Sequence, residues 1–191
     1  MKRLLILAAV LALPLGAQAV SMPGFCAKGI GSAEAKVCAA PGSAESEGLV
    51  FAMYRAALEK LDAGASKELQ EQHTAWWEGV KKCADAPNLN ACIDNAYGSR
   101  ALQLQSRYKV AKTTGPVAFT CGDKGKFSAT FLETTPASMV IERNKQHLLL
   151  RGERMASGIA YRNRGEEFRE HQGKVTIKWG ADIKEVSCKK S

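Results

Sequence analysis

The spacing of apolar residues divides the chain into a helical part and a strand part. From 48 to 61 apolar residues recur every three to four positions, and a second run of this kind extends from 69 to 83. A third run, from 93 to 104, follows the turn-forming segment 87–90. Because this spacing places the apolar side chains on one face of a helix, the first half predicts three amphipathic helices in a small bundle.

After Pro116 the apolar period changes to two. Apolar and polar residues alternate in 127–131 and again in 175–179, as in half-buried strands. Turn-forming residues divide this half into about eight strands, a number and spacing typical of an antiparallel barrel. The breaks are expected at 122–125, 134–136, 144–146, 152, 163–165, 172–173 and 180. The segment 109–116 separates the two parts, so we predict a two-domain α + β protein, with a helical domain at 20–112 and an eight-stranded antiparallel β-barrel at 113–191.

The N-terminus has the pattern of a secretory signal. Lys2 and Arg3 precede an apolar run over 4–15, which ends in Ala17-Gln18-Ala19. This run is shorter than the ~20 residues that a membrane-spanning helix needs. We therefore expect residues 1–19 to be a cleaved signal peptide and the mature protein to be periplasmic or secreted, and not membrane-spanning.

Six cysteines form an even set, and an exported protein meets an oxidising compartment. Two close pairs occur in the first half and one wide pair brackets the second half. The spacing therefore predicts disulfides between Cys26 and Cys38, Cys83 and Cys92, and Cys121 and Cys188. No Cys-x-x-Cys is present and the three histidines lie far apart, so no metal site is expected.

The second helical run contains residues for which packing is the simplest interpretation. Trp76 and Trp77 are expected at the core and the edge of that helix, and His73 is expected in solvent on its polar face.

The segment Ala156-Ser157-Gly158-Ile159-Ala160-Tyr161 lies between Cys121 and Cys188, with Phe119 and Thr120 upstream and Phe168 downstream. This pattern resembles the MliC/PliC family of C-type lysozyme inhibitors. The resemblance implies a barrel that inserts one loop into the lysozyme groove, where Ser157 hydrogen-bonds the catalytic carboxylates. Gly158 would allow a tight turn and Tyr161 would support the loop. The alternative is that Ser157 and Gly158 form an ordinary turn, with Tyr161 and Phe168 in the barrel core.

The family's second contact comes from a Phe-Trp-x-Lys-Gly stretch. The segment matching it here is Phe168-Arg169-Glu170-His171-Gln172, which has His171 at the lysine position. A neutral histidine is a poor substitute for lysine, so Lys174 or Arg169 is the alternative source of positive charge.

The helical part resembles the LprI-like N-terminal domain over 26–107. The matching residues are Cys26, Glu34, Cys38, Val50, Tyr54, Trp76, Cys83, Cys92, Ile93, Tyr97 and Arg100. The family pattern has a glutamine where this chain has His73 and an arginine where it has Val80.

The predicted function is therefore inhibition of C-type lysozyme, which would protect peptidoglycan. The distribution of charge supports an alternative function. Residues 113–191 carry 14 basic and 9 acidic side chains, whereas residues 20–112 carry 11 basic and 10 acidic ones. A basic barrel could instead bind anionic lipid or polysaccharide in the envelope. The arginines available for this are Arg143, Arg151, Arg154, Arg162 and Arg164.

No nucleophile with an adjacent base, phosphate loop or cofactor turn is evident, so the sequence predicts no enzyme, no catalytic residue and no cofactor. Nucleic acid is not an expected partner, and a homodimer is an open alternative to a monomer.

Overall fold

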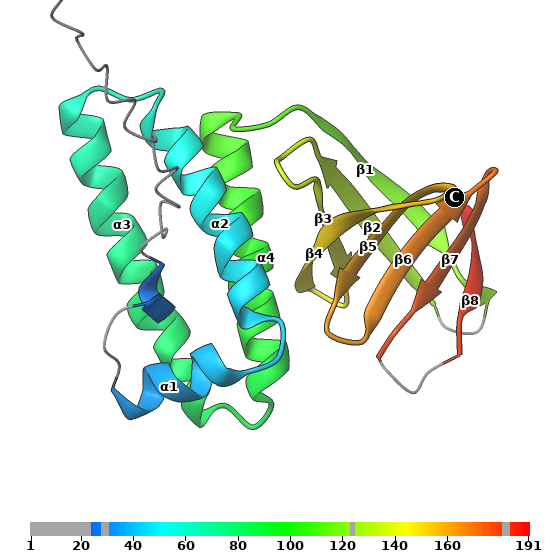
Figure 1. Cartoon of the computed structure of the whole chain (residues 1–191), viewed down its shortest axis with the longest axis horizontal. Helices are drawn as coiled ribbons and strands as arrows, with labels where there is room; N and C mark the ends of the chain where they lie inside the picture. The colour runs from blue at the N-terminus through cyan, green and yellow to red at the C-terminus, as the bar shows by residue number, and fades with distance from the viewer. Residues whose placement is uncertain (1–23, 28–30, 123–124, 181–183) are drawn as a thin grey trace, which may run out of the picture.

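A computed structural model of the chain describes residues 24–27, 31–122, 125–180 and 184–191. The expected signal peptide at 1–19 lies outside these residues. In the described part, helical elements come first and strands follow (Figure 1). The helical elements are η1 (Phe25–Ala27), α1 (Ser32–Ala39), α2 (Ser43–Leu58), α3 (Ala63–Lys81), η2 (Lys82–Asp85) and α4 (Leu89–Tyr108). The strands are β1 (Thr113–Thr120), β2 (Lys126–Leu132), β3 (Ser138–Arg143), β4 (Gln146–Met155), β5 (Gly158–Asn163), β6 (Glu166–His171), β7 (Lys174–Lys178) and β8 (Val186–Lys190).

Helices α2, α3 and α4 correspond to the three predicted helices, and α1 is an additional one. With eight residues and only Val37 buried, α1 has too short an apolar stripe to produce a clear helical period. Side-chain caps fix where two of the longer helices begin. Asp62 accepts a hydrogen bond from the Ala65 backbone nitrogen at α3, and Asn88 accepts one from Ala91 at α4.

The buried face of α3 differs from the predicted one. Leu69, His73, Trp77 and Val80 are the buried residues of this helix, and Trp76 is only partly buried. The expectation that His73 lies in solvent is wrong, because the spacing 69, 73, 77, 80 places it on the core face. Its ring stacks on Tyr54, with the two ring centroids 4.0 Å apart.

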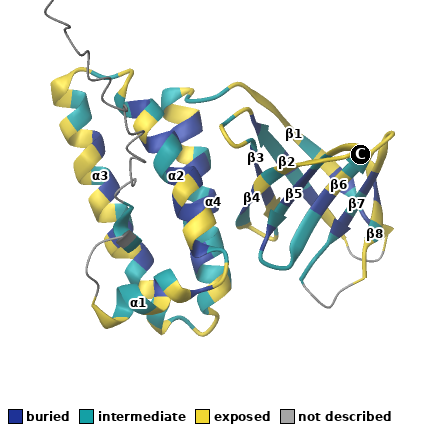
Figure 2. Cartoon of the chain, viewed as in Figure 1, coloured by how far each residue is buried: buried dark blue, intermediate teal, exposed yellow. Residues whose placement is uncertain are grey.

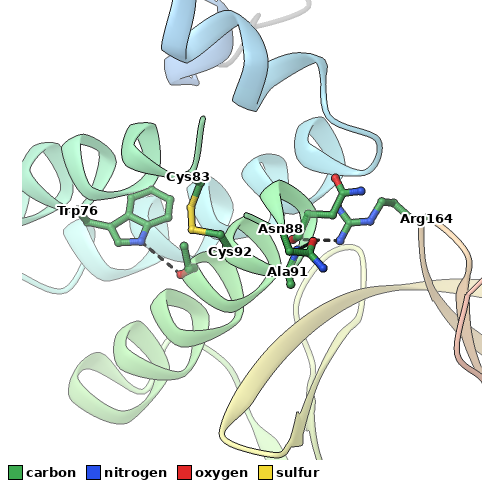
Figure 3. The surroundings of a disulfide bond; sticks show 8 residues. Trp76, Cys83, Asn88, Ala91, Cys92 and Arg164 are labelled. Atoms are coloured by element: carbon green, nitrogen blue, oxygen red, sulfur yellow. Dashed lines mark hydrogen bonds between the residues drawn. A yellow bond between two sulfur atoms is a disulfide. The ribbon is translucent and has the colours of Figure 1, made fainter. Parts of the chain in front are cut away.

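The three disulfides join the cysteine pairs that the spacing predicts. Cys26–Cys38 connects η1 to α1, and Cys83–Cys92 connects η2 to the first turn of α4, between Trp76 and Asn88 (Figure 3). Cys121–Cys188 links the residue after β1 to β8. The last of these therefore joins neighbouring strands at the point where the barrel closes.

The eight strands form a closed antiparallel barrel in chain order, as predicted. β1 pairs with β8 through Phe119 opposite Lys190 and Thr120 opposite Lys189. The interior is filled by aromatic and aliphatic side chains, among them Phe119, Phe127 and Phe168, whose rings contact one another.

The expected strand break at Gly152 is wrong, because Gly152 lies inside β4. Its backbone nitrogen donates to the Ala137 oxygen over 2.7 Å, and a Cβ at this position would lie 2.9 Å from that oxygen. The glycine is explained by close approach of two backbone segments, which needs no turn.

Helices α4 and α2 pack against the outer surface of the barrel, with α4 along β4. Leu132, Val140 and Leu149 of the barrel are buried in the same apolar cluster as the helix core. Figure 2 shows buried positions both along the helices and in the strands. Asn95 and Ser99 of α4 bind the backbone nitrogen and the Nδ1 atom of His147, at 3.0 and 2.9 Å. Within the described part of the chain, no helix has the length and apolar character needed to cross a membrane.

Candidate functional site

The β4–β5 connection is a two-residue turn that carries an exposed serine. Met155 and Gly158 pair across the two strands, which leaves Ala156 and Ser157 at the tip. Gly158 has φ +116°, a conformation that residues with a side chain rarely adopt, and a Cβ there would lie 3.1 Å from the Glu170 oxygen. The hairpin therefore depends on glycine immediately after Ser157.

The β6–β7 turn lies at the same end of the barrel, because alternate connections of an antiparallel barrel share an end. His171 and Lys174 pair across this turn, and Gln172 and Gly173 form its tip. The Nδ1 atom of His171 lies 3.2 Å from the Ser157 carbonyl oxygen. Since a carbonyl can only accept, Nδ1 carries the proton and donates it to Ser157.

The two turns border one groove of about 340 Å³. It is lined by Met155, Ser157, Ile159, Arg169, Glu170, His171, Lys174, Thr176 and Glu185. The structure thus brings Ser157 together with three residues of the expected second contact, which are Arg169, His171 and Lys174. It does not bring Tyr161 or Phe168 to the groove, because both side chains are buried in the barrel core, and their rings contact each other there.

The two cations at the groove, Arg169 and Lys174, differ in how strongly they are already bound. Arg169 forms an ion pair with Glu167, which also binds Arg162. Partial burial acts to raise the pKa of Glu167, but the hydrogen bonds from Arg162 and Arg169 outweigh it and hold that pKa below its usual value. Lys174 is exposed and forms no ion pair with a carboxylate in the described ranges, so its charge is the most available to a partner.

Met155 is a groove residue that sequence reasoning missed. Its side chain is 40% exposed, which is unusual for a large apolar residue in the described part of the chain. Exposed methionines are enriched at protein interfaces. The sequence could have indicated this position, because a two-residue hairpin turn that contains Ser157 places Met155 opposite Gly158 at the edge of the turn.

Across the described ranges, no three His, Cys, Asp or Glu side chains gather in a way that could hold a metal ion.

Most of the barrel is similar to a known protein family. Residues 119–185, which include every residue of the groove, match the profile of the family described as membrane-bound lysozyme-inhibitor of c-type lysozyme, MliC. The barrel is therefore similar to MliC in sequence.

A second similarity is to the proteins named lipoprotein LprI from Mycobacterium bovis and from two strains of Mycobacterium tuberculosis. Each is 25% identical to this chain over 114 residues, which is 59% of this chain. The matched region covers 58% of each relative, so the chain spans little more than half of their length. Both resemblances inferred from the sequence, to MliC and to LprI, are confirmed. No solved structure shows significant similarity to the chain.

Proposed function

We propose that this protein is an exported inhibitor of C-type lysozyme that blocks the active-site cleft with the β4–β5 turn and so protects peptidoglycan. One observation carries the proposal. The exposed turn at Ser157 and the free cation Lys174 border a single groove inside the segment that matches the MliC family.

The chemistry of the turn suits a lysozyme cleft. Such a cleft presents a protonated glutamic acid and an ionised aspartate. The Ser157 hydroxyl can accept a hydrogen bond from the acid and donate one to the carboxylate. Lys174 would add a charge-assisted contact to an anionic partner group, and His171 would hold the turn through the Ser157 carbonyl.

Long-range attraction is not the source of affinity in this proposal, because residues 20–191 carry 25 basic and 19 acidic side chains and C-type lysozymes are usually basic. Affinity would come from insertion of the turn and from desolvated short-range contacts. Glu170 and Glu185 at the groove would offset part of the repulsion close to the surface.

The alternative of a basic module that binds anionic lipid or polysaccharide is less well supported. Two of its arginines already bind carboxylates, since Arg162 pairs with Glu153 and Glu167, and Arg164 pairs with Asp94. These pairs reduce the positive charge that the barrel presents to an anionic surface.

Replacing Ser157 with alanine tests the proposal at one atom. Loss of a hydrogen bond to a charged group costs about 1.5–3 kcal/mol, which corresponds to roughly tenfold to hundredfold weaker inhibition of C-type lysozyme. The melting temperature should change little, because the hydroxyl is exposed. The matched control is Ser128→Ala on β2, across the barrel from β6, which should leave inhibition unchanged.

Unchanged inhibition by Ser157→Ala would remove this residue from the site. A lower melting temperature with normal inhibition per folded molecule would mean that Ser157 only stabilises an ordinary turn.

A further inference from the structure

The helical part buries an arginine that has no acidic partner. Arg100 on α4 is 3% exposed, and its guanidinium donates from one terminal nitrogen to Gln103 Oε1 over 2.6 Å. The other terminal nitrogen lies 3.3 Å from His73 Nδ1. The Nε atom is buried without a hydrogen-bond partner. Across the described ranges, no carboxylate forms a hydrogen bond or an ion pair with Arg100.

An isolated buried cation is unusual on physical grounds. A guanidinium keeps its charge at all physiological pH values, and burial of an unpaired charge is costly. The neighbours of Arg100 supply only weak compensation, from the amide oxygen of Gln103, the neutral ring of His73 and the face of Trp76, whose centroid is 5.8 Å from Cζ. A carboxylate would form the bidentate pair that arginine prefers.

Arg100 lines a groove of about 560 Å³ between α3 and α4. Ala75, Gly79 and Ala96 give it small side chains, Trp76 supplies an aromatic surface, and Gln103 lies beside Arg100. This volume is in the range of about 300–1,000 Å³ that small-molecule sites occupy. The groove is separate from the one at Ser157, which is lined only by barrel residues and the segment after β7.

We propose that this α3–α4 groove binds the terminal carboxylate of a short peptide through Arg100. The exposed Gln103 side chain marks the position of the ligand, because its amide oxygen accepts from Arg100 the hydrogen bond that a carboxylate oxygen would accept. The small side chains leave room for the peptide backbone, and Trp76 packs against it. This site gives the helical part a ligand of its own, independent of lysozyme.

The test uses the full mature chain and a defined probe, N-acetyl-alanyl-alanine with a free carboxylate. Its C-terminal amide is the matched control ligand. Nuclear magnetic resonance of isotope-labelled protein would follow the Arg100 guanidinium, the Trp76 indole and the Gln103 carboxamide during each titration. We expect saturable shifts at all three with the free acid and no saturable shift with the amide.

Two substitutions of the exposed Gln103 make the test specific to the guanidinium. Gln103→Glu supplies a carboxylate from the chain itself and should weaken probe binding at least about tenfold, as expected for loss of a charge-assisted contact. Gln103→Ala removes the amide without adding charge and should bind the acid at least as well as the native chain does. Circular dichroism of both variants should show a native helix content.

Three results would overturn the proposal. These are the absence of saturable shifts with the free acid, equal binding of the acid and the amide, and undiminished binding by Gln103→Glu. Any of them would mean that Arg100 only packs the helix core. Because no step involves lysozyme, the outcome is independent of whether the barrel inhibits that enzyme.

Discussion

At Ser157 the backbone carbonyl and the side-chain hydroxyl have different roles. The carbonyl oxygen accepts a hydrogen bond from His171, which ties the β4–β5 turn to the β6–β7 turn, while the side chain is exposed. Alanine at this position keeps the backbone contact and removes only the hydroxyl. This separation is the reason that Ser157→Ala distinguishes a binding role from a structural one.

His73 makes the free energy of unfolding depend on pH. Burial, reinforced by the nearby charge of Arg100, lowers the pKa of His73 from 6.5 to about 3. The unfolded chain binds this proton near the ordinary pKa, so acidification favours unfolding. The stabilisation is complete above pH 6.5 and is lost as the pH falls toward about 3. Between pH 7 and pH 5 the loss is about 2 kcal/mol.

Glutamine at position 73 should flatten this pH dependence, because its amide oxygen can still accept from Arg100 but does not titrate. Urea unfolding of the native chain and of His73→Gln at the two pH values would measure the difference. Glu47 affects the pH dependence of the free energy of unfolding in the opposite direction, because burial raises its pKa. Since Glu47 is present in both proteins, its effect cancels in the comparison. Parallel pH curves for the two proteins would contradict a neutral, buried His73.

Helix α4 lies so close to β4 that position 98 has no room for a side chain. A Cβ on Gly98 would lie 2.6 Å from the His147 Cβ and 2.9 Å from its backbone carbon. Gly98→Ala should therefore destabilise the protein by about 1–3 kcal/mol, as overpacking does.

Gly48→Ala is the matched control, because Gly48 also lies in a helix but a Cβ there would meet no atom within 4 Å. It should stabilise the protein by about 0.5–1 kcal/mol. Equal changes in the free energy of unfolding for the two substitutions, measured by denaturant unfolding, would mean that α4 does not pack closely against β4.

At the level of elements, periodicity predicted most of the fold. The period near 3.6 located α2, α3 and α4, because each of these helices has one buried face. The alternating period located β2 and β7, and turn-forming residues delimited the other strands. Periodicity failed for α1, which buries only Val37. The expectation for His73 failed because its polar side chain suggested a solvent position, whereas its ring packs among Phe25, Tyr54 and Trp76. The expected break also failed at Gly152, where a glycine inside a strand marks close backbone approach.

The contact between the helices and the barrel is reflected in the sequence by apolar runs that do not alternate with polar residues. Val140-Ile141 and Leu148-Leu149-Leu150 are continuous apolar runs, and such runs occur where both faces of a strand are covered. Hairpin rules place Ser157, His171 and Lys174 at one end of the barrel. The binding of Arg169 by Glu167 depends on side-chain conformations that the sequence pattern does not contain.

For the molecule as a whole, adjacent leucines on β4 connect the two cores. Leu149 is 1% exposed and packs in the helix cluster, whereas Leu150 is 0% exposed and packs inside the barrel. Replacing either with alanine should cost about 2–5 kcal/mol. We expect helix and strand signals to be lost at one denaturant concentration in both variants, because the halves share buried side chains.

Far-ultraviolet circular dichroism would follow the helices in this experiment, and hydrogen exchange of β-strand amides would follow the barrel. Separate transitions in Leu149→Ala would show that 20–112 and 113–191 are independent folding units. A single transition would show that they unfold together.

The most direct test of the proposed function is a turbidity assay of cell-wall lysis with the purified mature protein. Lysozymes of the C, G and I types would each be assayed with increasing inhibitor, using Ser157→Ala and Ser128→Ala as the paired variants. We predict dose-dependent protection against the C-type enzyme, weakened by Ser157→Ala and unaffected by Ser128→Ala. Absence of protection against all three lysozymes would contradict the proposal.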